Sequence, residues 1–326
     1  MASIRKKGSG YEAMVSRKGV RKSQTFRTKA QAAMWAADVE RDILAGKYST
    51  GPDRPFADLL RKYASVVSPT KRGCRWEVLR IESICRDVIG SVMLSDLRPV
   101  HFAEYRDRRL VDVTAATVRR EWNLLSHALN VAINEWGWIT DNPLKSVKRP
   151  APPPPRDRRL SENEIERLLF ALGYDYGSKP ETVTARVGAA MLFAIETAMR
   201  TGEICKLSWH DVDLDKRVAH LPKTKNGFAR VVPLSAEAVR IVDQVRIDES
   251  ESVFNLRTSQ IDALFRKAKS RALIGDLHFH DTRAEATTRL SAKVDILTLA
   301  RITGHRDLKM LQVYYRESME DVAKRI

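Results

Sequence analysis

The chain has 326 residues and a mass of 37.0 kDa, which allows two or three domains at roughly 100–200 residues each. Hydrophobic residues make up 43% and charged residues 30%, an ordinary globular composition that excludes global disorder. Lys and Arg number 57 against 41 Asp and Glu, so the net charge is +16. Such an excess suits a polyanionic partner, of which nucleic acid is the commonest.

The cysteines and the apolar segments bear on where the protein works. Cys74, Cys85 and Cys205 are odd in number and widely spaced, so they predict neither a disulfide framework nor a zinc site. The first residues are basic without an apolar stretch, unlike a signal peptide. The longest apolar run, residues 187–195, is far shorter than the roughly 20 residues that cross a bilayer. We therefore expect a protein of a reducing cytoplasm that is not in a membrane.

The first 30 residues hold nine Lys or Arg and a single acid, Glu12, and so carry half of the net charge. Residues 11–16 and 23–26 alternate as strands do, with Gly19 in the turn between them. Thr28 then caps a helical run. We expect a small basic sheet packed on one helix over about residues 1–48. The alternative is a disordered, solubilising tail.

Residues 56–138 repeat apolar positions every three or four residues, which predicts an all-helical unit of roughly four helices rich in arginine. Residues 150–155 read PAPPPP, which cannot continue a helix and predicts a stiff, extended connector. Basic residues flank it on both sides. We place a domain boundary here and expect that the connector can lie along a phosphate backbone.

A third unit follows the connector. Ser161 and Glu164 form a capping box that predicts a helix to Leu172, and an apolar helix is expected over residues 185–199. A hairpin is expected with strands over residues 218–221 and 230–233 and with Asn226-Gly227 at the turn. Four more helices are expected to begin at Ser235, Ser259, His280 and Val294. The predicted fold class is therefore mainly α with small β elements, an α+β fold.

This unit carries five short motifs, in order Thr197-Ala-Met-Arg200-Thr-Gly-Glu203, Pro222-Lys-Thr-Lys225-Asn-Gly, His280-Asp-Thr-Arg283, Thr303-Gly-His305 and Tyr314-Tyr315-Arg316. The set resembles the tyrosine recombinase family, in particular phage-type and genomic-island integrases, over essentially the whole chain. Tyr314 lies nine positions after His305, as in the family. Ala284 and Thr303 stand where the family often has histidine and leucine, at positions that we expect to carry no chemistry.

The residue types also suit cleavage of a phosphodiester without a metal or another cofactor. The guanidinium groups of Arg200 and Arg283 can neutralise a pentacoordinate phosphorus. Lys225 can protonate the departing 5′ oxygen. Glu203, three residues after Arg200, can hold that guanidinium in place. Tyr314 is the expected nucleophile, giving a covalent phosphotyrosine that conserves the bond energy for rejoining.

Two histidines complete the expected site, and the nucleophile and the lysine each have an alternative residue nearby. His280 either accepts the tyrosine proton or bonds the phosphate, and His305 donates a hydrogen bond to the same phosphate. Tyr315 competes with Tyr314 as nucleophile, and the spacing favours Tyr314. Lys223 competes with Lys225, which we prefer because the family places its lysine just ahead of the turn.

The resemblance also implies a domain organisation. It assigns residues 1–50 to an arm-type DNA-binding domain, 55–148 to a helical core-binding domain, 149–159 to a basic linker and 160–326 to the catalytic domain. The second and fourth parts would clamp the duplex. The expected DNA contacts are basic side chains in all of these parts: Arg5, Lys6, Lys7, Arg17, Lys18, Arg21, Lys22, Arg119, Arg120, Lys148, Arg149 and Arg230.

By the same resemblance the partners are double-stranded DNA recombination sites, on which the protein assembles as a homotetramer while being monomeric free in solution. A host DNA-bending factor and an excision helper are further expected partners. The expected place of work is the bacterial cytoplasm, on the nucleoid. The implied reaction exchanges strands through a Holliday junction and integrates or excises a phage or genomic island.

Two other functions compete with this interpretation. A type IB topoisomerase-like enzyme would use similar phosphotyrosine chemistry to relax supercoils, but the three-part layout with its basic N-terminal part favours a recombinase. A DNA-binding regulator without catalysis is compatible with the net charge alone. The complete set of catalytic side chains argues against it, since a protein that only binds DNA has no use for them.

Overall fold

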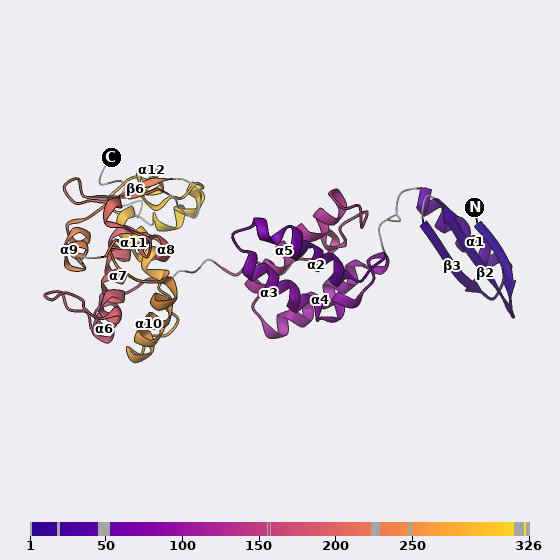
Figure 1. Cartoon of the computed structure of the whole chain (residues 1–326), viewed down its shortest axis with the longest axis horizontal. Helices are drawn as coiled ribbons and strands as arrows, with labels where there is room; N and C mark the ends of the chain where they lie inside the picture. The colour runs from indigo at the N-terminus through magenta and orange to yellow at the C-terminus, as the bar shows by residue number, and fades with distance from the viewer. Residues whose placement is uncertain are drawn as a thin grey trace. The chain divides into compact units, whose positions relative to one another are not determined.

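The computed structural model describes residues 2–17, 20–44, 53–154, 156, 158–222, 229–246, 250–315 and 323. The chain divides into two compact units, residues 1–155 and 156–326, and each is described by itself (Figure 1). Within the described residues the fold is mostly helical with two small antiparallel sheets, which confirms the predicted α+β class.

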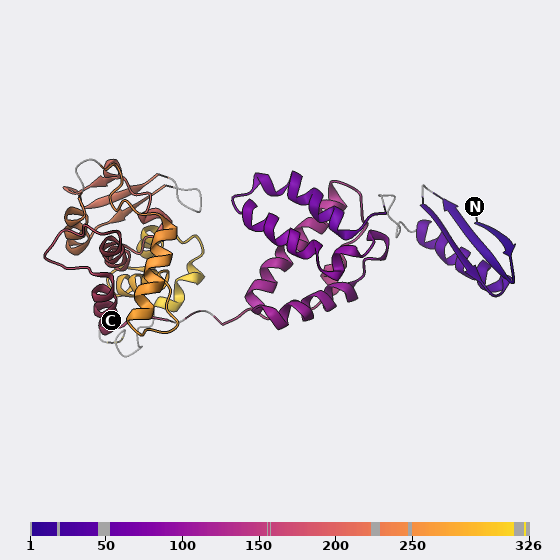
Figure 2. The same ribbon diagram turned by 60° about the horizontal axis from the view of Figure 1, so that its bottom comes forward.

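The first unit begins with a three-stranded antiparallel sheet in the order β1 (Ala2–Lys7), β2 (Gly10–Arg17), β3 (Val20–Phe26). Helix α1 (Lys29–Leu44) lies along one face of this sheet (Figure 2). Its buried residues, Ala32, Ala36, Val39 and Ile43, form a small core with Ala13 and Val15 of the middle strand. A folded module therefore replaces the alternative of a disordered tail.

Strand β1 was not foreseen from the residue pattern. It is an edge strand whose side chains are nearly all exposed, so it lacks the apolar alternation that marks a half-buried strand. Its basic side chains are held by the one acid of the neighbouring strand. Arg5 Nε donates to Glu12 Oε2 over 2.6 Å, and Lys7 Nζ donates to Glu12 Oε1 over 2.7 Å.

The rest of the first unit is helical and has its own core. Its long helices are α2 (Phe56–Val66), α3 (Cys74–Cys85), α4 (Pro99–Asp112) and α5 (Ala115–Asn134). Aromatic side chains fill the middle of this core, among them Phe56, Tyr63, Phe102 and Tyr105. The carboxylate of Glu121 is fully buried there and accepts hydrogen bonds from Tyr105 and Arg109, at 2.7 Å and 2.9 Å.

The second unit is built around α7 (Val183–Thr197), a helix that is buried on nearly all sides. Its small residues, which include Ala189, Ala190 and Ala194, allow neighbours to pack closely on several faces. These neighbours are the helices α6 (Glu162–Leu172), α9 (Ala236–Gln244), α10 (Thr258–Arg271) and α11 (Asp281–Ser291). Helix α6 begins with the predicted capping box of Ser161 and Glu164.

Shorter elements complete the second unit. A second antiparallel sheet has the order β4 (Val212–Asp213), β5 (Val218–Leu221), β6 (Arg230–Pro233), of which the first strand was not foreseen. The Asn226-Gly227 turn expected between β5 and β6 lies outside the described residues. The remaining described elements are α8 (Thr201–Ile204), α12 (Ile296–Thr303) and 3-10 turns at Trp209–Asp211, Leu308–Met310 and Gln312–Tyr314.

Two of the three arginines after the proline segment pair with α11 of their own unit, and the third, Arg158, pairs with Glu164 of α6. Arg156 donates two 2.8 Å bonds to Asp281, and Arg159 donates two bonds to Glu285 at 3.0 Å and 3.1 Å. Both acids are buried. These ion pairs therefore hold the segment that follows the prolines against α11.

Candidate active site

The end of α7 positions the first arginine. Ala198 takes a left-handed conformation (φ 52°) that an alanine rarely adopts, and it ends the helix two residues before Arg200. The predicted helix to residue 199 is therefore slightly too long. Arg200 then lies at the N-terminus of α8 in an extended conformation, and the carbonyl of Ala198 becomes available to another arginine of the site.

The carboxylate of Glu203 is the centre of the site. It accepts from the backbone N–H of Arg200 at 2.8 Å and from Nη1 of the same residue at 2.9 Å. Arg230 of β6 adds two parallel bonds, from Nη1 at 2.8 Å and from Nη2 at 2.7 Å. Burial alone would raise the pKa of Glu203, but the hydrogen bonds from Arg230 and Arg200 outweigh it and lower the pKa to about 2. The carboxylate is therefore ionised at neutral pH.

Arg230 is an interior residue. Its side chain is only 8% exposed, and its Nε donates to the carbonyl of Ile302 over 2.9 Å. Gly304, with φ at 72°, leaves room for it, because a Cβ there would come within 3.2 Å of Arg230 Nη1. We had expected Arg230 to contact DNA. The structure corrects this, since its guanidinium is engaged by Glu203 and the Ile302 carbonyl.

Arg283, on the first turn of α11, is buried to 5% exposure. One terminal nitrogen donates to the carbonyl of Ala198 and the other to the carbonyl of Thr303. Burial lowers the pKa of Arg283 to about 9, and the positive charges of Arg200 and Arg230 act in the same direction. The guanidinium remains charged at pH 7, in a position where a bound anion would relieve the repulsion.

His305 follows the glycine that ends α12. Its Nδ1 is 2.7 Å from the hydroxyl of Thr303. Burial lowers the pKa of His305 to about 4, and the charges of Arg283, Arg200 and Arg230 contribute further. The imidazole is therefore neutral at pH 7 in this structure. The same three guanidinium groups therefore act on the His305 ring and on one another.

The two adjacent tyrosines are held differently. Tyr315 donates its hydroxyl proton to the carbonyl of Val294 over 2.9 Å, which engages it in a structural contact. Tyr314 is held by its backbone, whose carbonyl accepts from Ser291 Oγ over 2.9 Å. Burial raises the pKa of Tyr314, and the charge of Arg283 opposes this shift. The phenol close to the guanidinium cluster is thus that of Tyr314, while Tyr315 is engaged elsewhere.

The structure says less about the other residues that were expected to be catalytic. His280 precedes α11 with an exposed side chain, and its carbonyl accepts from the backbone N–H of Arg283 over 3.1 Å. Lys225 and its competitor Lys223 lie outside the described residues. In the part of the chain that the structure describes, no group of three or more His, Cys, Asp or Glu side chains is placed to hold a metal ion.

Among the expected DNA contacts, Lys6, Arg17, Arg21 and Lys148 are exposed, whereas Lys18 lies outside the described residues. Arg5 and Lys7 are exposed but pair with Glu12, and Lys22 is half-buried. Arg119 and Arg149 are also half-buried and donate to backbone carbonyls of Pro150 and Arg119, which ties the last helix of this unit to the chain that follows it.

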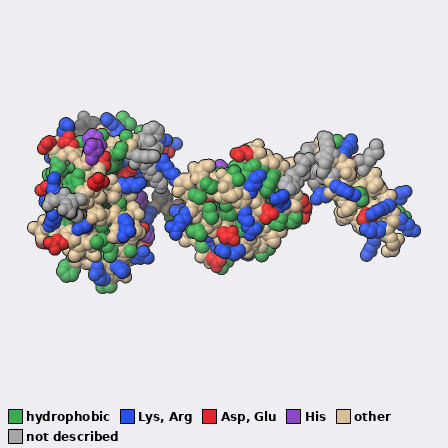
Figure 3. All heavy atoms as spheres, in the orientation of Figure 1, with side chains coloured by type: hydrophobic (Ala, Val, Ile, Leu, Met, Phe, Trp, Pro, Cys, Tyr) green, Lys and Arg blue, Asp and Glu red, His purple; other side chains and the backbone are tan. Residues whose placement is uncertain are grey.

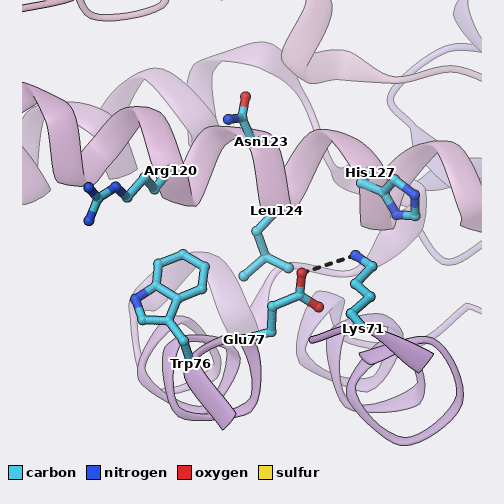
Figure 4. Close-up of a pocket in the computed structure, with 7 residues that line it drawn as sticks. All are labelled: Lys71, Trp76, Glu77, Arg120, Asn123, Leu124 and His127. Carbon is cyan, nitrogen blue, oxygen red and sulfur yellow. Dashed lines mark hydrogen bonds and ion pairs between the residues drawn. The ribbon is translucent and has the colours of Figure 1, made fainter. Parts of the chain in front are cut away.

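Arg120 lines a cavity of about 480 Å³ between α3 and α5. Figure 4 shows Arg120 and Leu124 of α5 across from the indole of Trp76 and from a Lys71–Glu77 ion pair of 3.0 Å. Hydrogen-bonding groups and an indole that is 40% exposed thus share one hollow surface of the helical part.

The sequence argument missed two members of the site. Arg230 has no local signal, because the partner that buries it lies 27 residues away in the chain. Thr303 was noted only as a departure from leucine, although its hydroxyl bonds the ring of His305. Its place in the last turn of α12, two positions before the histidine, was the signal that the sequence offered.

Comparison with known proteins assigns this arrangement to a family. The model of the phage integrase family matches residues 158–321, the part that holds every residue of the site. A putative integrase/recombinase of Haemophilus influenzae is 44% identical over 329 residues, covering 98% of this chain and 89% of that protein. The chain belongs to the phage integrase family of tyrosine site-specific recombinases.

Similarity to a further relative and to solved structures agrees with this family assignment. A shufflon-specific DNA recombinase of Escherichia coli is 37% identical over 270 residues, 78% of this recombinase and 67% of that protein. Crystal structures of lambda integrase, as a dimer bound to a COC′ core site and as a tetramer bound to a Holliday junction, share the fold with TM-scores of 0.68 and 0.67. Each is 18% identical and covers 97% of this chain and 96% of its own.

The structure also bears on the expectation that the recombinase is not in a membrane. Of the helices formed by the described residues, none is long and apolar enough to cross a bilayer.

The Glu203 carboxylate generates a stability prediction. In Glu203→Gln, the two arginines lose a charged partner, and removing one side of a buried ion pair costs about 3 kcal/mol. Because the pKa of Glu203 is lowered on folding, its contribution is complete above about pH 4.5 and is lost as the pH falls towards about 2. Urea unfolding of the full chain should show the deficit at pH 7 and a shrinking deficit below pH 4.5.

Asp213→Asn is the matched control, since it removes an ion pair with Lys216 whose lysine side chain is 80% exposed. We expect it to change the free energy of unfolding by less than about 1 kcal/mol. Equal effects of the two variants, or a deficit in Glu203→Gln that is independent of pH, would contradict the role given to Glu203.

Proposed function

We propose that the recombinase cleaves and rejoins DNA through a covalent 3′-phosphotyrosyl link to Tyr314. The observation that carries this proposal is the gathering of Arg200, Arg283, His305 and the Tyr314 phenol around one strongly cationic position. Arg200 and Arg230 share the single carboxylate of Glu203, and Arg283 adds a third guanidinium whose bonds go to neutral carbonyls, so the site keeps an excess of positive charge that a phosphate would neutralise.

The reaction follows from these groups. The Oη of Tyr314 attacks the scissile phosphorus and gives its proton to a basic group of the site, the bond from phosphorus to the 5′ oxygen breaks, and the 3′ phosphate stays on the protein. Arg200 and Arg283 neutralise the charge on the non-bridging oxygens, using donors that their structural bonds leave over. Lys225 supplies a proton to the 5′ oxygen. The reverse attack by a 5′ hydroxyl rejoins the strand without external energy, because one ester replaces another.

We propose double-stranded recombination sites as the partner, contacted by all parts of the chain. Lys and Arg side chains gather over the N-terminal sheet on the face shown in Figure 3, which supports an arm-type DNA-binding role for residues 1–50. The hollow beside Arg120 supports a core-binding role for residues 55–148. Residues 149–159 are then the linker and 160–326 the catalytic domain. Such binding neutralises phosphates and should weaken steeply with salt.

The assembly that we propose is a homotetramer on DNA that exchanges strands through a Holliday junction, formed from monomers free in solution. The lambda integrase tetramer on such a junction supports the assembly by its shared fold. The role is integration and excision of a phage or genomic island in the bacterial cytoplasm, on the nucleoid. A DNA-bending factor and an excision helper of the host or element would assist it.

The nucleophile can be tested with a DNA substrate nicked next to the cleavage position, which traps the covalent adduct because the short 5′ fragment diffuses away. Tyr314→Phe should abolish the adduct and leave DNA binding within about twofold, because only the attacking oxygen is lost. Tyr315→Phe is the matched control and should keep forming adducts. Gel electrophoresis with labelled DNA measures both. Adducts with Tyr314→Phe, and their loss with Tyr315→Phe, would move the nucleophile by one residue.

The general acid can be tested by replacing the bridging 5′ oxygen with sulfur, since a thiolate departs without needing a proton. Lys225→Ala should slow cleavage of the oxygen substrate at least about 100-fold and cleave the sulfur substrate at nearly the wild-type rate. Lys223→Ala, the matched control, should be near wild type on both. Arg200→Ala should be slow on both, because its charge is needed in either case. Rescue by sulfur in Lys223→Ala alone would assign the proton to Lys223.

A further inference from the structure

The turn that leads into α11 is held by a residue of the segment that follows the prolines. Arg156 donates to both carboxylate oxygens of Asp281 over 2.8 Å, through Nε and Nη2. Its Nη1 donates to Oδ1 of Asp276 over 2.9 Å, and its Nη2 donates to the carbonyl of Asp276 over 2.6 Å. One guanidinium therefore binds both ends of the turn formed by residues 276–281.

The first end of this turn has a backbone conformation that needs support. Asp276 has φ at 29°, in the left-handed region that is uncommon for a residue with a Cβ. Such a conformation persists where the surrounding structure holds it, and it is frequent near functional sites. The two bonds that Asp276 accepts from Arg156 provide support of this kind. His280 lies four residues further on, inside the same turn.

The second end of the turn is buried. Asp281 is 4% exposed, and its Oδ2 accepts from the backbone N–H of His278 over 2.8 Å as well as from Arg156. Three successive backbone hydrogen bonds of 2.9–3.2 Å then close residues 278–283 into the start of α11. The position of His280, in the middle of these bonds, therefore depends on where the carboxylate of Asp281 is held.

The neighbouring arginines bind other elements. Arg159 reaches one turn further along α11, to Glu285, and Arg158 pairs with Glu164 of α6. A guanidinium has five N–H donors, and the four bonds of Arg156 to the turn use most of them. Arg156 thus has little left to offer a phosphate, although it lies in a basic segment.

We propose that Arg156 is a positioning residue for strand cleavage, which orients His280 through the carboxylates of Asp276 and Asp281. The proposal rests on the phosphotyrosyl mechanism proposed above and on the part expected of His280 in it, as acceptor of the tyrosine proton or as partner of the phosphate. The end of the linker thereby belongs to the support of the catalytic site.

His280 depends on this support more than Arg283 does. The guanidinium of Arg283 is held by the carbonyls of Ala198 and Thr303, which belong to other segments, so its place does not follow from the turn alone. His280 has an exposed side chain on the turn itself, so a shift of the turn moves its imidazole directly. A misplacement of about 1 Å can slow an enzyme about 100-fold.

The test uses the full chain and two arginines of the same linker. Arg156→Gln removes the charge and the planar fork that bind the turn. Arg158→Gln is the matched control, because it breaks an ion pair with α6 instead. Asp276→Ala is a second variant, chosen because its carboxylate is 79% exposed and its loss leaves the buried Asp281 in place. Urea unfolding checks that each variant is folded.

Two quantities are measured for each variant, with and without the additional change His280→Ala. The rate of covalent adduct formation is measured at saturating nicked DNA, and the DNA affinity is measured by gel shift. A third readout follows His280 itself. The chain is labelled with ¹⁵N-histidine, and the NMR signal of His280 is identified by its absence in His280→Ala. If His280→Ala forms no measurable adduct, this signal decides alone.

Arg156→Gln should form adducts at least about tenfold more slowly than wild type and bind DNA within about twofold, because the turn moves while the DNA contacts stay. Asp276→Ala should be about threefold slower, since it removes one side of the support. Arg158→Gln should stay within about twofold of wild type. In chains with His280→Ala, Arg156→Gln should cost less than about twofold, because the residue through which it acts is gone.

The His280 signal should shift in Arg156→Gln and Asp276→Ala and stay in place in Arg158→Gln. Equal adduct rates of the two arginine variants would overturn the inference. A lower DNA affinity with an unchanged rate at saturation would make Arg156 a DNA contact instead. An equal loss with and without His280, or an unmoved His280 signal in Arg156→Gln, would show that Arg156 does not act through His280.

These outcomes differ from a failure of the mechanism on which the inference rests. Each of them can occur while Tyr314 still forms the adduct. Adducts formed by Tyr314→Phe would instead remove the phosphotyrosyl link to Tyr314 itself.

Discussion

The carboxylate of Glu203 is the interaction on which the site depends. It binds Arg200 through both backbone and side chain and Arg230 through a parallel pair of hydrogen bonds, all between 2.7 Å and 2.9 Å. It thereby joins the end of α7 to strand β6, and Arg230 joins both to the end of α12 through the Ile302 carbonyl. Three separate segments of the catalytic unit are fixed relative to one another by one buried anion.

Arg283 lies beside the arginines that Glu203 holds in place. Arg283 lies between carbonyls of Ala198 and Thr303, close to two other guanidinium groups whose charge lowers its pKa. Such repulsion costs stability in the free protein, and in the mechanism proposed above a bound phosphate relieves it. The left-handed backbone at Ala198 and Gly304 belongs to the same arrangement, because each turn presents a carbonyl or a space to an arginine.

The sequence predicted what depends on local pattern. The α+β class, the capping box at Ser161 and the buried α7 follow from spacing and composition, and the structure contains all three. Strand β1 was missed because an exposed edge strand has no apolar alternation. Arg230 was expected at the surface because nothing near it in the chain reveals a partner 27 residues away.

The most direct test is a crystal structure of the full chain, as Tyr314→Phe, bound to DNA that contains a cleavage position mapped with the wild-type protein. The account predicts that Arg200 and Arg283 both donate to the non-bridging oxygens of the scissile phosphate while Arg230 stays on Glu203. A scissile phosphate held away from these two arginines, or an Arg230 that has left Glu203 to bind DNA, would contradict it.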